Sequence, residues 1–349
     1  MVRNIVKNII LTAVVILAAC CARACAYELY WGDLHSHTSF SDGQGLADEA
    51  FDFARNEGKT DFWTVSDHLE QLQGRQDLPP GAPPEDEFGF IVKTAGEKTA
   101  DGEFVAIPGF EWATDYSQGH INAINAKKIP SFAEAYQIKR FYKWVYKHPE
   151  VMIGFNHPWE SNGKHFNDFE FVPPIYEQVI FCAVTQREDI PFFYKALDRG
   201  WWVAPSAHQD NHEKNWGLHK SGNFTAVYAD KLTYDSLMEA LRARRFFATN
   251  DRPSKIWFAG NGQPMGSKLT GDSVELEIEV SHAEGAKISA VTLVGGGGAE
   301  IRKWNPGEAE FKTKVTEKAD RDKPLWFAVL AEFDNGRYAI SAPISIKKL

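Results

Sequence analysis

Polar residues recur in this chain directly after short apolar segments that have the composition of buried strands. The segments are DFWTV, FVAIPGFEW, VMIGFNHPW and GWWVAPSAHQDNH, and each ends in or runs into histidine, aspartate or glutamate. Parallel strands of α/β proteins present their carboxyl ends at one edge of the sheet, where the following loops build the functional site. The repeated placement therefore predicts that polar clusters far apart in the sequence meet in space.

Helical patterns alternate with these strands. One helical face of QGLADEAFDFARNEG is formed by Leu46, Ala50, Phe53 and Ala54. A second helix is expected over residues 191–199, and Thr233 is placed to cap a third in YDSLMEALRARR. The alternation of strands and helices predicts an α/β domain with a largely parallel sheet.

The pattern changes at about residue 253. Segments such as VELEIEVS and LWFAVLAEF alternate apolar and polar residues, and turn signals such as NG lie between them. We expect a small antiparallel β-sandwich over residues 253–349. The glycine run at 295–298 is not followed by Lys-Ser/Thr or by a helical pattern, so it predicts a hairpin turn rather than a phosphate-binding loop.

Residues 1–26 have the composition of an export signal. MVRNIVKN is positively charged, and IILTAVVILAA is an apolar run shorter than a comfortable membrane span. Two processing sites compete: LAAC resembles the lipobox of bacterial lipoproteins and would leave an acylated Cys20, whereas ACA fits ordinary signal peptidase and would leave Tyr27 first. In either case we expect an exported, periplasmic or extracellular protein that contacts the membrane only through the signal or a lipid anchor.

Cysteine usage and charge exclude two classes of protein. Three of the four cysteines lie in the expected signal, and Cys182 lies in the apolar run QVIFCAV, so we expect a small core residue and no disulfide framework. The net charge of −9 argues against a nucleic-acid-binding surface. Residues 71–86 are rich in proline, glycine and charge, and are interpreted either as a loop that covers the site or as a connector.

The stretch WGDLHSHTSFSDG, residues 31–43, brings His35, His37 and Asp42 close together in the sequence. A buried core does not require this mixture of side chains. Imidazole and carboxylate ligands without a thiol suit Zn²⁺, Mn²⁺ or Fe²⁺. Because SDH, with Asp67 and His68, follows the next predicted strand, the sequence predicts a metal site at this edge of the sheet.

The same segments resemble the polymerase and histidinol phosphatase (PHP) superfamily of metal-dependent hydrolases. DLHSHTSFSDG resembles its first motif, VSDH at 65–68 its second, NHP at 156–158 its third and QDNH at 209–212 its last. Glu111 in PGFEW stands where the family places a bridging glutamate. The ordered set covers residues 31–251. The export signal and the β-rich tail also resemble exported members grouped with carbaryl hydrolases.

The resemblance implies a distorted (β/α)7 barrel over residues 27–252 that holds two to three divalent ions, Zn, Mn or Fe. The first ion would be held by His35, His37, Glu111 and Asp210. The second would be held by Glu111, His120 and His157, where His120 is assigned only by its position after Glu111. The third would be held by Asp42, His68 and His212.

One position departs from the family pattern, because Gln209 stands where serine is usual and is preceded by His208. We expect His208 either to face the substrate as an acid or base, or to replace a metal ligand. Asp67 lies beside a predicted ligand. We expect it to orient that ligand through a hydrogen bond or, alternatively, to act as a helix N-cap or turn residue.

The resemblance implies hydrolysis by a metal-activated water. The first candidate substrate is a small phosphate ester, either a phosphodiester or a phosphomonoester, because the same ions would bind its oxygens. The second candidate is an amide, carbamate or carboxylic ester. A third interpretation is a non-catalytic exported binding protein that uses the β-rich region for recognition, and the nearly complete ligand set argues against it.

Overall fold

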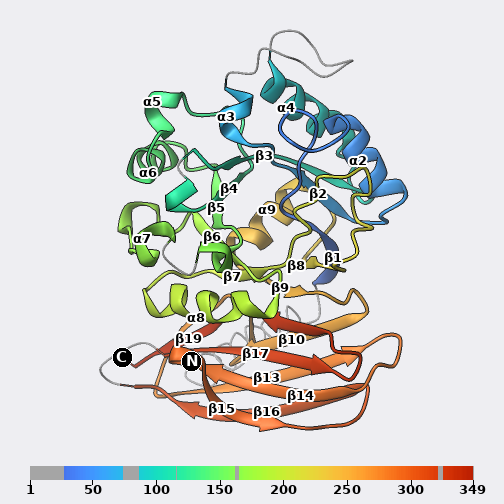
Figure 1. Cartoon of the computed structure of the whole chain (residues 1–349). Coiled ribbons are helices and arrows are strands. Elements are labelled where there is room, and N and C mark those ends of the chain that lie inside the picture. The colour runs from blue at the N-terminus through green and yellow to red at the C-terminus, as the bar shows by residue number, and fades with distance from the viewer. Residues whose placement is uncertain (1–26, 74–85, 115, 162–164, 321–324, 349) are drawn as a thin grey trace, which may run out of the picture.

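The structure is a computed structural model that describes residues 27–73, 86–114, 116–161, 165–320 and 325–348. The expected export signal and most of the expected covering loop lie outside these residues. Figure 1 shows a mixed α/β region in blue to yellow above a β-rich region in orange and red. The candidate ligands all belong to the α/β region.

The α/β region is built on a sheet with the strand order β9-β8-β1-β2-β3-β4-β5-β6-β7. Its strands are β1 (Glu28–Asp33), β2 (Phe62–Val65), β3 (Val105–Trp112), β4 (Ile121–Ile124), β5 (Met152–Phe155), β6 (Val179–Ala183), β7 (Ala204–Ser206), β8 (Phe224–Ala229) and β9 (Phe246–Thr249). Most are short, fully buried segments of apolar and small residues, as expected for strands that are covered on both faces.

Two strands depart from the largely parallel sheet that the sequence predicts. β1, β2 and β3 are parallel neighbours, as are β5, β6 and β7, but β4 is antiparallel to both β3 and β5. β8 is antiparallel to β1 and β9. A parallel connection needs a crossover of a dozen or more residues, and the link from β3 to β4 is shorter than that, so the chain returns in the opposite direction. The first residues of β4 therefore lie at the edge where β3 and β5 end.

Helices cover the sheet and connect its strands (Figure 1). They are α2 (Ala47–Asn56), α3 (Leu69–Leu72), α4 (Glu87–Lys98), α5 (Phe132–Ala135), α6 (Ile138–Tyr146), α7 (His165–Phe169), α8 (Ile190–Asp198) and α9 (Tyr234–Arg242). The face predicted for the first helix is oriented correctly, since Ala50 and Ala54 of α2 are buried. The predicted cap of α9 is confirmed, because Thr233 accepts a hydrogen bond from the Ser236 amide.

The β-rich region contains two sheets. One has the order β11-β10-β13-β16, formed by β10 (Ser254–Gly260), β11 (Gln263–Pro264), β13 (Ser273–His282) and β16 (Glu310–Lys318). The other contains β12 (Lys268–Thr270), β14 (Ile288–Gly295), β15 (Ala299–Trp304), β17 (Leu325–Phe333), β18 (Tyr338–Ser341) and β19 (Ile344–Lys347). Because β18 pairs with β9, this second sheet continues the sheet of the α/β region.

Two smaller predictions are confirmed. Gly296–Gly298 form a short 3-10 turn between the antiparallel strands β14 and β15, which is the expected hairpin connection. Cys182 is fully buried in β6, and burial raises the pKa of its thiol well above the ordinary value, so it is a core residue. Within the described ranges, we find no helix with the length and apolar character needed to span a membrane.

Candidate metal centre

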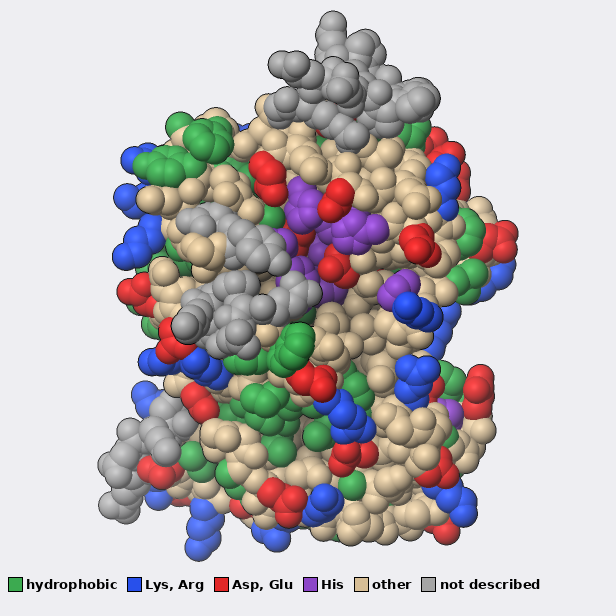
Figure 2. Space-filling view, in the orientation of Figure 1, with side chains coloured by type: hydrophobic (Ala, Val, Ile, Leu, Met, Phe, Trp, Pro, Cys, Tyr) green, Lys and Arg blue, Asp and Glu red, His purple; other side chains and the backbone are tan. Residues whose placement is uncertain are grey.

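All nine predicted ligands lie together at one edge of the α/β sheet. Figure 2 shows histidine side chains gathered in the middle of one face of the molecule, with acidic side chains among them. The segment after β1 supplies three of the nine, and the others lie at the ends of five further strands. They are His35, His37 and Asp42 after β1, His68 after β2, Glu111 near the end of β3, His120 before β4, His157 after β5, and Asp210 and His212 after β7. The strand-end pattern in the sequence therefore corresponds to one site.

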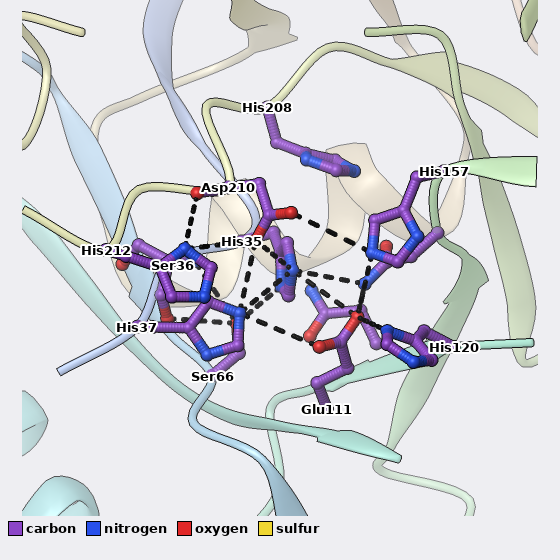
Figure 3. A network of polar contacts seen from close by, with 12 residues as sticks. His35, Ser36, His37, Ser66, Glu111, His120, His157, His208, Asp210 and His212 are labelled. Carbon is purple, nitrogen blue, oxygen red and sulfur yellow. Dashed lines mark hydrogen bonds and ion pairs between the residues drawn. The ribbon is translucent and has the colours of Figure 1, made fainter. Parts of the chain in front are cut away.

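Glu111 is the centre of this cluster and is almost fully buried. Its Oε1 atom lies 3.4 Å from His35 Nε2, 3.4 Å from His120 Nδ1 and 3.3 Å from His157 Nε2. Its Oε2 atom lies 3.1 Å from His68 Nδ1. Figure 3 shows the rings of His35, His120 and His157 directed toward the carboxylate from different sides. One carboxylate thus touches rings from four different segments, which is the arrangement expected of a bridging group.

A second group of donor atoms is formed by His35, His37 and Asp210. The Nδ1 atom of His35 contacts Ser66 Oγ at 2.9 Å, and the Nδ1 atom of His37 contacts Ser41 Oγ at 3.2 Å. The two Nε2 atoms therefore face the interior and lie 3.3 Å apart, and Asp210 Oδ1 lies 3.0 Å and 3.2 Å from them. Three donor atoms at such distances require a shared proton or a common cation between them.

The third group lies at the surface of the cluster. Asp42 Oδ1 lies 3.2 Å from His212 Nε2, and Asp42 Oδ2 lies 3.6 Å from His68 Nε2. The His212 ring stacks on His37 with 4.2 Å between the ring centres. The side chains of Asp42 and His212 are 48% and 38% exposed, whereas those of His35 and Glu111 are buried. The centre thus has a buried part and a part open to solvent.

The geometric groups overlap the predicted ligand sets without matching them one to one. Donor atoms within 4.8 Å of one another form three groups: His35 with Glu111 and His157; His35 with His37 and Asp210; and His37 with Asp42, His68 and His212. His120 approaches Glu111 but is in none of these groups. Imidazole and carboxylate donors without a thiol fit Zn²⁺, Mn²⁺ or Fe²⁺. The assignment of each residue to an ion stays a prediction.

Ion pairs within the cluster shift the pKa values of its members. Burial alone raises the pKa of Glu111, but the surrounding histidines, His35 first, outweigh it and hold the pKa well below the ordinary value. Burial lowers the pKa of His68, yet Asp42 and Glu111 outweigh it and raise the pKa to about 11. A hydrogen bond with Asp42 raises the pKa of His212 to about 9. Protons on histidine therefore balance the carboxylates in the ion-free chain, and bound cations would replace them.

Three buried residues support the centre although the sequence pattern did not single them out. Asp33 joins the first and last motifs, because its two carboxylate oxygens accept hydrogen bonds from the amides of His35 and Gln209 at 2.8 and 2.7 Å. Asn156 donates to Glu111 Oε1 at 2.6 Å, and Ser66 contacts the His35 ring. Asp33 and Asn156 each lie within two residues of a predicted ligand, which is the signal that could have identified them.

Asp67 has a different set of contacts from the one expected of a partner to His68. Its fully buried carboxylate accepts hydrogen bonds from the amide and the hydroxyl of Thr38, both at 2.7 Å, and from the Ser41 hydroxyl at 2.5 Å. Ser41 in turn contacts His37. Asp67 thus anchors the loop that carries His37 and Asp42, and its link to a predicted ligand passes through Ser41.

His208 lies beside the centre and is 1% exposed. Its ring meets that of His35 edge to face, with 4.9 Å between the ring centres. Burial, followed by the charge of His35, lowers the pKa of His208 well below the ordinary value. Figure 3 shows the ring on the side of the centre formed by His157 and Asp210.

No family model matches this chain. It is similar to uncharacterized proteins of Chlamydia pneumoniae (22% identical over 283 residues), Chlamydia muridarum (24% over 345 residues) and Chlamydia trachomatis (23% over 314 residues). These matches cover 72%, 88% and 78% of this chain but 44%, 53% and 48% of the respective relatives. The chain therefore spans about half the length of the curated relatives it matches.

The chain also resembles a solved structure, a two-domain protein from Bacteroides vulgatus that contains a predicted PHP-like metal-dependent phosphoesterase. The TM-score is 0.53 at 18% sequence identity, and the match covers 91% of this chain and 96% of that chain. At this identity the likeness shows a shared fold. Because the coverage is so high, the shared fold includes both the α/β region and the β-rich region.

Proposed function

We propose that this chain is an exported metal-dependent hydrolase of the PHP superfamily, of the type grouped with carbaryl hydrolases, and that it acts on a phosphate ester. In this proposal, residues 27–252 form a distorted (β/α)7 barrel and residues 253–349 form a β-sandwich. The observation that carries the proposal is the convergence of nine imidazole and carboxylate side chains, among which Glu111 is buried at the centre. The fold shared with a protein described as containing a PHP-like phosphoesterase supports it.

Two to three divalent ions, Zn, Mn or Fe, would be held by the sets that the resemblance implies. The buried ions would bind His35, His37, Asp210, His120 and His157, with Glu111 shared between them. The outer ion would bind Asp42, His68 and His212. Such ions, when bound, make water acidic enough to act as a nucleophile near neutral pH and stabilise negative charge that develops on the substrate.

The chain itself fixes the orientation of the donor groups. Ser66 holds Nδ1 of His35, so Nε2 of that ring faces the centre. Asn156 holds one oxygen of Glu111 by a hydrogen bond and leaves the other directed at His68. Asp33 fixes the backbone on both sides of the centre. Partners of this kind orient metal ligands, and losing one typically lowers metal affinity or activity by about 10- to 100-fold.

A second candidate function is hydrolysis of an amide, carbamate or carboxylic ester. One observation favours it: among the described residues, every ion pair made by Glu111, Asp42 and Asp210 is with a histidine. No lysine or arginine in the described chain is thus paired into the centre, where it could neutralise a doubly charged phosphate. A substrate with less charge would need only the ions and neutral donors.

Hydrolysis assays on the metal-reconstituted chain distinguish these candidates. The substrates are bis-p-nitrophenyl phosphate, p-nitrophenyl phosphate and p-nitrophenyl acetate, with His35→Ala as the inactive variant. His148→Ala is the matched control, since His148 pairs with the Trp144 carbonyl outside the centre. We expect metal-dependent release from a phosphate substrate, reduced at least about 100-fold by His35→Ala and unchanged by His148→Ala.

The other outcomes are equally informative. Metal-dependent cleavage of the acetate alone would replace the phosphoesterase proposal with the second candidate. Bound metal with no cleavage of any of the three substrates, or a chain that binds no metal after reconstitution, would contradict both enzyme proposals. The latter result would favour the third interpretation, a non-catalytic binding protein.

A further inference from the structure

His208 is a buried imidazole whose two ring nitrogens have no hydrogen-bond partner among the residues that the structure describes. Buried polar groups almost always have partners, and an unpaired one is costly to keep, so each exception needs an explanation. Its ring lies against His35 and faces the part of the centre between His157 and Asp210 (Figure 3). The missing partner must therefore come from that side.

Hydrogen bonds from other segments fix the backbone at His208 and at the next residue. Asn223 donates from its side-chain amide to the His208 carbonyl at 2.9 Å and to the Thr185 carbonyl at 3.0 Å. The backbone N–H of the next residue, Gln209, donates to Asp33 at 2.7 Å, and the side-chain oxygen of Gln209 accepts from the Gly217 backbone N–H at 3.0 Å. Bonds on both sides fix the position from which the imidazole extends, so its orientation is built into the loop after β7.

The geometry separates His208 from the candidate ligands. Donor atoms that share one metal ion lie close together, and His208 belongs to none of the three groups within 4.8 Å. His120 is outside these groups as well, but its Nδ1 atom lies 3.4 Å from the Glu111 carboxylate, whereas His208 makes no ion pair or hydrogen bond through its ring among the described residues. Its ring is nevertheless in direct contact with His35, which belongs to two of those groups. His208 is therefore placed to touch a molecule bound at the centre rather than to hold the ions.

We propose that His208 is a substrate-binding residue, whose ring donates a hydrogen bond to an oxygen of an oxyanion bound on the His157 and Asp210 side of the centre. This inference rests on the proposed function and deepens it, because it assigns the recognition of one anionic oxygen to a side chain that is not a metal ligand. A neutral donor at this position partly replaces a lysine or arginine, since none in the described part of the chain pairs with Glu111, Asp42 or Asp210.

Binding of inorganic phosphate to the Mn²⁺-loaded full chain tests the proposal, measured by calorimetry on wild type, His208→Phe and His208→Gln. His208→Phe removes both nitrogens and keeps a planar ring, whereas His208→Gln keeps a donor. We expect His208→Phe to weaken phosphate binding by about tenfold or more, since one hydrogen bond to a charged group is lost. His208→Gln should recover part of the affinity. His148→Phe, which lies outside the centre, is the control and should bind as wild type does.

Metal content and the visible spectrum of the Co²⁺-loaded chain are measured on the same samples. Unchanged metal content and an unchanged spectrum in His208→Phe, together with weaker phosphate binding, support the proposal. Loss of an ion or a changed spectrum would identify His208 as a ligand and overturn it. Equal phosphate affinity in wild type and His208→Phe would also overturn it, while leaving the proposed metal centre intact.

Two further results are covered by this design. A wild-type chain that binds metal but no phosphate would overturn the inference together with the phosphate form of the proposed function. If His208→Phe does not fold, NMR of the imidazole nitrogens in the wild-type chain is measured instead. The His208 signal is identified by its absence in His208→Gln. The His208 resonance should then move on phosphate addition, and a resonance that stays fixed would contradict the proposal.

Discussion

At the residue scale, the histidines of the centre divide their two ring nitrogens between the protein and the cluster. His35 and His37 use Nδ1 for serine hydroxyls, and His212 uses Nδ1 for the Asp210 carbonyl at 2.9 Å. In each ring Nε2 is directed at a carboxylate of the cluster. A metal-binding histidine is held in this way, with one nitrogen fixed so that the other presents its lone pair.

Proton release on metal binding is a prediction at this scale. The pKa of His68 is raised to about 11 and that of His212 to about 9, above the ordinary 6.5, so both rings carry protons at pH 7.5 in the ion-free chain. A metal must displace these protons, and its apparent affinity should rise with pH by about tenfold per pH unit for each proton released. Calorimetric titration with Mn²⁺ at pH 6.5 to 8.5, in two buffers of different ionisation enthalpy, measures the protons directly.

The raised pKa values of His68 and His212 also make the stability of the ion-free chain depend on pH. Because the folded-state pKa values are raised, the stabilisation is complete below about pH 6.5 and is lost as the pH rises through 9 for His212 and 11 for His68. Thermal unfolding of the ion-free chain should therefore move to lower temperature as the pH rises above about 6.5. In the calorimetric titration, a metal affinity that does not change with pH, with no protons released, would contradict the protonation of His68 and His212. An unfolding temperature that does not change with pH would contradict it as well.

Most of the predicted ligands could be proposed from the sequence because they lie in short local motifs, whereas His120 was assigned only by its position after Glu111. The supporting roles of Asp33, Ser66 and Asn156 could not be predicted, because each lies near a predicted ligand in the sequence but acts through a contact with a residue far along the chain. Asp67 illustrates the difference: its position beside His68 indicated a contact with that ring, but its hydrogen bonds go to the loop after β1. Such contacts depend on how distant segments are brought together, which local patterns do not contain.

At the element scale, the direction of β4 decides where His120 lies. Only an antiparallel β4 brings its first residue, and therefore His120 before it, to the edge where Glu111 is found. Asn122 of β4 also donates to the Leu34 carbonyl, which ties this strand to the segment that carries His35. The sequence placed His120 only by its position after Glu111 and gave no direction for this segment, so the orientation of β4 required the structure.

Close packing of β5 against β6 gives a prediction at this scale. A Cβ atom on Gly154 would lie 2.0 Å from the ring of Phe181, its register partner, and that ring is fully buried. Gly154→Ala should lower the free energy of unfolding by about 1–3 kcal/mol and disturb the strand that ends at His157. Gly96→Ala in α4 is the matched control, because nothing lies within 4 Å of its Cβ position. It should stabilise the chain by about 0.5–1 kcal/mol.

Urea unfolding of both variants and of wild type measures these changes. Phosphate-ester hydrolysis or metal content should fall in Gly154→Ala under conditions where the control is unaffected. A Gly154→Ala chain as stable as wild type would show that β5 and β6 can separate without cost, and that the position of His157 does not depend on their packing.

At the scale of the whole molecule, the β-rich region supports loops next to the centre. Arg187, in the loop after β6, pairs with Glu332 at 2.6 Å and lies over the Tyr338 ring at 5.1 Å. Arg337 donates to the Ser221 carbonyl at 3.0 Å, in the connection between β7 and β8. Asn223, in the connection between β7 and β8, donates to the Thr185 carbonyl in the loop after β6 and to the His208 carbonyl. The β-rich region therefore contacts the two loops that hold the backbone of His208.

The change of pattern near residue 253 predicted that a β-rich region begins there, and strands do follow from Ser254. The pattern could not show that β18 pairs with β9, because the two strands are separated by most of the β-rich region. This pairing makes one sheet run through both parts of the molecule (Figure 1). Long-range strand pairing of this kind has no signature in local alternation.

The most direct test of the central claim, a multinuclear metal centre built around Glu111, is elemental analysis of the purified and reconstituted chain beside Glu111→Gln. The substitution keeps the size of the side chain and removes the charge that the buried ions would share. We predict two to three divalent ions per wild-type chain and a loss of more than one ion in Glu111→Gln. A wild-type chain without stoichiometric metal, or metal content unaffected by Glu111→Gln, would contradict the account.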